Sequence, residues 1–133
     1  MRIPFGVVVL FFVTGHAWPQ AAPAAATLVG SWEGESKCTV PDSPCHDEHA
    51  LYRITADKKN PAQLNIDGYK VVDGSPQFMG ALSCQYHAEK ANLSCTDGKQ
   101  ADWEFHVSAD TMTGTLTVGP EKTLYRRINV RKK

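Results

Sequence analysis

From Trp32 onward, apolar and polar residues alternate with a period of two, the spacing of a β-strand that buries one face. The segment 32–40 places Trp32, Gly34 and Ser36 on one face and charged residues on the other. The same alternation returns after each cluster of turn-forming residues, in segments 50–55, 64–72, 78–86, 92–96, 102–107, 111–118 and 124–130. No stretch of this part of the chain has the period of an amphipathic helix.

The connections between these segments are short and rich in turn-forming residues. Asp97-Gly98 lies between two of them and is a strong hairpin signal. Asp67-Gly68 interrupts the third segment, where it indicates a bulge or kink. About eight evenly spaced strands predict an all-β fold, an antiparallel up-and-down barrel. A two-sheet sandwich is the alternative that the same pattern allows.

The chain begins like a secretory signal peptide. Arg2 precedes an apolar run over residues 5–13, and small residues follow up to Ala17. We interpret residues 1–26 as a signal peptide with an Ala/Pro-rich leader, cleaved near residue 17 or within 22–26. The run is too short to span a bilayer, so no transmembrane segment is expected after cleavage. Residues 27–133 are then a single exported domain, periplasmic or secreted.

The balance of acidic and basic residues limits the classes of binding partner that we expect. Of the 14 basic residues only Arg2 precedes Thr27, so 13 basic and all 14 acidic residues belong to the predicted domain. A net charge near zero gives no electrostatic reason to expect nucleic acid or an anionic membrane surface.

Four cysteines in a small exported domain indicate two disulfides rather than catalytic thiols. Three pairings are possible. Cys38 and Cys45 bracket a Pro-rich loop, and Cys84 and Cys95 bracket a predicted hairpin. We favour these two local pairs because they leave both loops closed and no thiol free. Neither pair has the Cys-x₂-Cys spacing of a zinc site, so no metal is expected.

Two motifs at opposite ends of the domain resemble the lipocalin/calycin superfamily. They are Gly30-Ser31-Trp32 on the first segment and Arg126, within Tyr125-Arg126-Arg127, on the last. The resemblance implies a closed barrel whose floor is sealed by the tryptophan packed against the arginine. Alternation places Arg126 on the inward face and Arg127 on the outward one. A cation–π contact between Trp32 and Arg126 is therefore predicted, with a structural role.

A barrel of this size either fills its interior with side chains or holds one small ligand. Apolar residues on the inward faces are ordinary core residues in one case and cavity wall in the other. The candidates for a ligand-binding wall are Tyr52, Met79, Trp103, Phe105 and Met112.

The densest polar cluster follows the first cysteine pair. It consists of His46, Asp47, Glu48 and His49, residue types that bind metals or transfer protons. However, the two histidines would point to opposite faces of a strand, which disfavours a joint site. A polar loop tethered by a disulfide is the plainer interpretation. Because loops at a barrel mouth commonly carry recognition, this cluster is the predicted recognition loop.

Three functions remain open. The first is a binding protein for a small apolar molecule, non-catalytic, monomeric and without cofactor. The second is an exported inhibitor of a secreted or periplasmic hydrolase of the protease or lysozyme type, docking through the Cys38–Cys45 loop. The third is an enzyme that uses the histidine cluster; we rank it last because no catalytic motif accompanies the cluster.

Overall fold

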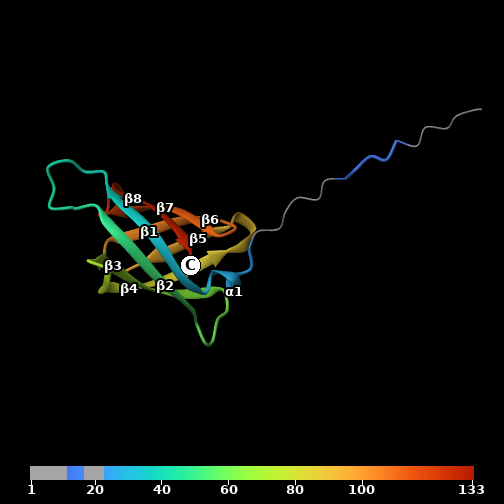
Figure 1. The fold of residues 1–133 in the computed structure, drawn as a ribbon, viewed down its shortest axis with the longest axis horizontal. Helices are drawn as coiled ribbons and strands as arrows, with labels where there is room; N and C mark the ends of the chain where they lie inside the picture. Colours follow the sequence, from blue (N-terminus) through green and yellow to red (C-terminus); the bar gives the residue numbers. More distant parts are fainter. Residues whose placement is uncertain (1–11, 17–22) are drawn as a thin grey trace, which may run out of the picture.

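The computed structural model describes residues 12–16 and 23–133 of the 133-residue chain. Eight strands follow one short helix, with a single 3₁₀ turn between the fourth and fifth strands (Figure 1). The elements are α1 (Ala25–Leu28), β1 (Gly30–Cys38), β2 (Glu48–Ala56), β3 (Gln63–Val72), β4 (Ser75–His87), η1 (Ala88–Lys90), β5 (Asn92–Thr96), β6 (Ala101–Ser108), β7 (Thr111–Val118) and β8 (Thr123–Lys132). The predicted cleavage positions at 17 and 22 lie outside the described residues.

The strands close into one antiparallel barrel in sequence order, and β1 pairs with β8 across the seam. The predicted up-and-down barrel is therefore confirmed, and the two-sheet sandwich is excluded. Gly34 explains how tightly the seam closes. A Cβ atom at this position would lie 2.1 Å from the carbonyl oxygen of Asn129, so only glycine allows β1 to approach β8 this closely.

The bulge predicted at Asp67-Gly68 is present, but its extra residue is on β4 and not on β3. The β3–β4 register shifts between Gly68 and Tyr69, which pair with Gly80 and Phe78. The extra residue of this bulge is Met79, on β4. Met79 is 57% exposed and leaves the strict alternation that the sequence pattern assumed.

The floor of the barrel is sealed by α1 and the residues before it. The Trp32 indole Nε1 donates to the carbonyl oxygen of Leu28 at 2.8 Å, and Lys132 Nζ donates to that of Thr27 at 2.5 Å. From β4, the Tyr86 hydroxyl donates to the carbonyl oxygen of Pro23 at 2.5 Å. Within the described residues, contact with the barrel therefore already includes Pro23, ahead of residue 27.

The register across the seam corrects the predicted contact between Trp32 and Arg126. Trp32 is paired with Lys132, whereas Arg126 is paired with Cys38 at the other end of β1. Six residues of strand span roughly 20 Å, too far for a cation–π contact. The inward orientation of Arg126 and the outward orientation of Arg127 were predicted correctly. Lys132, and not Arg126, is the cation beside the floor tryptophan.

Both predicted disulfides are confirmed. Cys38–Cys45 closes the loop between β1 and β2, and Cys84–Cys95 joins directly paired residues of β4 and β5 inside the barrel. Two disulfides in so small a barrel indicate maturation in an oxidising compartment. Within residues 12–16 and 23–133, no helix is long and apolar enough to cross a membrane.

Candidate ligand-binding cavity

The size of the inward-facing side chains changes along the barrel axis. Toward the floor the interior is filled by large side chains, all nearly inaccessible: Trp32, Ile54, Leu64, Ile66, Leu93, Phe105, Val107, Met112 and Val130. Toward the opposite end, which we call the mouth, β1 and β2 present Ser36 and Ala50, and β3 and β4 present the facing pair Gly68 and Gly80. Small residues there leave the interior unfilled.

A cavity of about 390 Å³ occupies this end of the barrel. Its volume lies in the range of small-molecule sites. Its wall combines aromatic and aliphatic side chains with four charged ones and is formed by Ser36, Glu48, Ala50, Tyr52, Gly68, Tyr69, Met79, Gly80, Ala81, Leu82, Asp97, Lys99, Trp103, Leu116 and Arg126.

The structure divides the five predicted ligand-binding residues into two groups. Tyr52, Met79 and Trp103 line the cavity. Phe105 and Met112 do not: they are 1% and 0% exposed and belong to the core beneath it. The Phe105 ring packs edge-on against Tyr52, with ring centroids 5.8 Å apart. Gly114 makes room for it, because a Cβ atom there would lie 2.4 Å from the Phe105 ring. Tyr52 therefore separates the cavity from the core.

Arg126 is a cavity residue that the sequence interpretation assigned to the floor. Its Nη1 donates to the Ser36 carbonyl oxygen and hydroxyl, both at 3.3 Å, and to the His46 carbonyl oxygen at 3.0 Å. Its Nη2 donates to Glu48 Oε1 at 3.2 Å. The side chains of this ion pair are only 12% and 26% exposed. The sequence carries no local signal for this position, because Ser36 and Arg126 are 90 residues apart and come together only through the β1–β8 register.

Tyr52 provides a neutral hydroxyl beside this ion pair. Burial raises the pKa of Tyr52 well above its ordinary value, and the nearby Glu48 carboxylate raises it further, while Arg126 acts in the opposite direction. The phenol therefore stays protonated at physiological pH.

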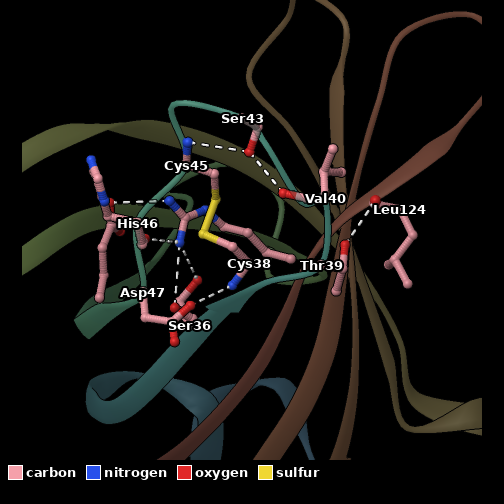
Figure 2. Close-up of a disulfide and its surroundings, with 11 residues drawn as sticks. Ser36, Cys38, Thr39, Val40, Ser43, Cys45, His46, Asp47 and Leu124 are labelled. Carbon is pink, nitrogen blue, oxygen red and sulfur yellow. Dashed lines mark hydrogen bonds and ion pairs between the residues drawn. A yellow bond between two sulfur atoms is a disulfide. The ribbon is translucent and has the colours of Figure 1, made fainter.

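The disulfide loop between β1 and β2 extends past the mouth (Figure 1). Figure 2 shows how it is held: Thr39 Oγ1 donates to the Leu124 carbonyl oxygen at 2.8 Å, and Ser43 Oγ donates to that of Val40 at 2.9 Å. After the disulfide, Asp47 Oδ1 accepts from the Cys38 backbone N–H at 2.8 Å. Bonds at both ends and a covalent closure fix the shape of this loop.

The predicted recognition cluster is distributed over two sides of the wall. Glu48 points into the cavity, and His49 lies outside, where its Nε2 is 2.8 Å from Glu33 Oε1. Lys133 and His49 hold the pKa of Glu33 below its usual range. His46 contributes its carbonyl oxygen to the Arg126 network, and the Asp47 carboxylate accepts from the Cys38 backbone N–H. In the part of the chain that the structure describes, no three His, Cys, Asp or Glu side chains converge on a possible metal position.

A second hollow, of about 450 Å³, adjoins the cavity and contains the rest of the cluster. We call it the side groove; its walls are residues 44–49, the end of β3 at 70–72, Tyr125 and Arg126. The groove exists because β2 and β3 separate at the mouth. Their pairing ends at Ala50 and Lys70, although β3 continues to Val72. Glu48 and Arg126 line both spaces.

Comparison with known proteins adds no assignment to this geometry: the chain matches no protein-family model and no curated protein sequence.

Proposed function

We propose that this protein is an exported, non-catalytic binding protein of the lipocalin/calycin type that holds a small, largely apolar molecule in the barrel. The observation that carries the proposal is the cavity of about 390 Å³ at the mouth. Aromatic and aliphatic side chains, among them Tyr52, Leu82 and Trp103, supply the apolar wall. The signal-like leader and the two disulfides support export.

The cavity belongs to the fold rather than to a chance packing defect. Large core residues in the floor half are nearly inaccessible, while the mouth half carries glycine at two facing positions, Gly68 and Gly80. A void of this size left without a ligand forgoes dispersion contacts along the apolar part of its wall. Retaining it is consistent with an occupant that restores those contacts.

Filling the cavity tests the proposal. A Cβ atom at Gly68 would meet only ordinary van der Waals contacts, 3.5 Å from the Gly80 carbonyl oxygen and 3.7 Å from the Tyr52 ring. Gly68→Leu should therefore fold and place its side chain in the cavity. We expect the wild-type protein to bind the neutral fluorescent probe N-phenyl-1-naphthylamine saturably at one site, and Gly68→Leu to weaken that binding by about tenfold or more.

The matched control is Thr113→Leu, which adds a leucine at an exposed position on β7. This variant should bind the probe as the wild type does, and urea unfolding should confirm that both variants are folded. Equal affinity in Gly68→Leu and wild type would contradict the proposal.

A second candidate is the inhibitor of a secreted hydrolase, which the Cys38–Cys45 loop favours. The loop projects from the mouth and is fixed by its disulfide and by the bonds of Thr39 and Ser43 (Figure 2). A loop fixed in this way loses little conformational entropy on docking. In that case Gly68→Leu would leave inhibition of the target hydrolase unchanged, which separates the two functions.

A further inference from the structure

The cavity and the side groove form one two-part site. The cavity wall contains more aliphatic and aromatic side chains than charged ones, whereas the groove wall contains His46, Asp47, His49 and Lys70. The two spaces meet at Glu48 and Arg126, which line both. A molecule with an apolar tail and a polar head would match this division, with its tail in the barrel and its head between β2 and β3.

The charges around the site are balanced. Its carboxylates belong to Asp47, Glu48 and Asp97, and its cations belong to Lys70, Lys99 and Arg126. Two of these charges, Glu48 and Arg126, already form an ion pair at 3.2 Å. No excess charge of either sign is therefore presented to a ligand head.

The pairing of Arg126 disfavours an anionic head. Both terminal nitrogens of its guanidinium already donate, Nη1 to Ser36 and His46 and Nη2 to Glu48. A ligand carboxylate would have to displace the Glu48 carboxylate or lie beside it, and like charges in a poorly solvated site repel. A cationic head is also disfavoured, because the Glu48 carboxylate that it would pair with is already neutralised by Arg126.

A neutral head with hydroxyl groups has neither difficulty. Arg126 contacts only Oε1 of Glu48, and a hydroxyl both donates to carboxylate oxygens and accepts from ammonium groups. Such a head adds hydrogen bonds without burying an unpaired charge. Resting on the function proposed above, we infer that the ligands of this site are neutral amphiphiles with a hydroxylated head and that the Arg126–Glu48 pair selects against free carboxylates.

Calorimetric titration with probes that share an eight-carbon chain tests this inference. The probes are octyl β-glucoside, 1-monooctanoylglycerol, octanoate and octyltrimethylammonium, each kept below the concentration at which it forms micelles. We expect at least one of the two neutral probes to bind about tenfold or more tightly than both ionic probes. The tighter neutral probe identifies a sugar or a glycerol head as the better match.

Glu48→Gln examines the role of the ion pair. Removing the competing carboxylate frees the Arg126 guanidinium, so octanoate affinity should rise about tenfold. Affinity for the preferred neutral probe should not rise, because the variant also loses a carboxylate oxygen that a ligand hydroxyl can donate to. Glu104→Gln, on the exposed face of β6, is the matched control and should change neither.

Two outcomes would overturn the inference: octanoate binding most tightly to the wild type, or unchanged octanoate affinity in Glu48→Gln. Failure of the proposed function would give a different result. N-phenyl-1-naphthylamine would then not bind the wild type, or it would bind Gly68→Leu as tightly as the wild type. The wild-type ranking of the four probes requires no variant to fold.

Discussion

Replacing Trp32 by alanine is expected to lower the free energy of unfolding by about 3–5 kcal/mol, the range for large aromatic residues removed from a core. The side chain is 1% exposed and is surrounded by the floor half of the core. Its removal leaves a cavity that neighbouring strands cannot fill, because each is fixed in the barrel by pairing on both sides. Urea unfolding followed by circular dichroism measures the loss.

Trp32→Phe separates the hydrogen bond from the packing. Phenylalanine keeps most of the apolar volume but leaves the Leu28 carbonyl oxygen without the indole N–H that it accepts from at 2.8 Å. We expect a loss of about 1–3 kcal/mol, smaller than for alanine. A loss in Trp32→Phe equal to that in Trp32→Ala would show that the bond to α1, and not packing, dominates.

The same measurement tests the corrected position of Trp32 relative to Arg126. Since the two residues lie at opposite ends of the barrel, the losses in Trp32→Ala and Arg126→Ala should add within about 0.5 kcal/mol. A coupling clearly above this value would restore the cation–π contact that the sequence resemblance implied.

Arg126→Leu is expected to lower the free energy of unfolding by about 2–4 kcal/mol. The leucine keeps an apolar stem but removes every donor that Arg126 supplies to Ser36, His46 and Glu48. Ser36 is 2% exposed, so water does not readily replace the lost bonds there. The Glu48 carboxylate is left half-buried with no cation bonded to it.

The matched control is Arg127→Leu, the same change one residue along β8 on the exposed face. It should alter the free energy of unfolding by no more than about 0.5 kcal/mol. The loss of unfolding free energy in Glu48→Gln should lie between those of Arg126→Leu and Arg127→Leu, because the guanidinium then keeps its three bonds to Ser36 and His46. Equal losses in Arg126→Leu and Arg127→Leu would show that the network at the mouth contributes nothing to stability.

The local features of the fold could be predicted because they depend on short-range physics. Period-two alternation identifies strands wherever one face is buried, and Asp97-Gly98 marks a hairpin through its backbone preferences alone. The disulfides followed for the same reason: each joins cysteines only seven or eleven residues apart, on a loop or hairpin visible in the sequence.

The candidate site was only partly predictable. All five candidates were predicted to line a ligand cavity; Tyr52, Met79 and Trp103 line it, whereas Phe105 and Met112 belong to the core. Alternation reports which face a side chain occupies and not how far along the barrel axis it lies. The cavity depends on the second quantity, since it arises where Ser36, Ala50 and the glycines of β3 and β4 come to the same level.

By itself, the sequence predicted the strands, the turns and the two local cysteine pairs, because each depends on residues close together in the chain. The pairing of β1 with β8 decided between a closed barrel and a two-sheet sandwich. Only the tertiary structure decided the register between β1 and β8, which are some 90 residues apart. That register is set by strand tilt and core packing around the whole barrel. It places Lys132 beside Trp32 at the floor and moves Arg126 to the mouth, where it pairs with Glu48 between the cavity and the side groove.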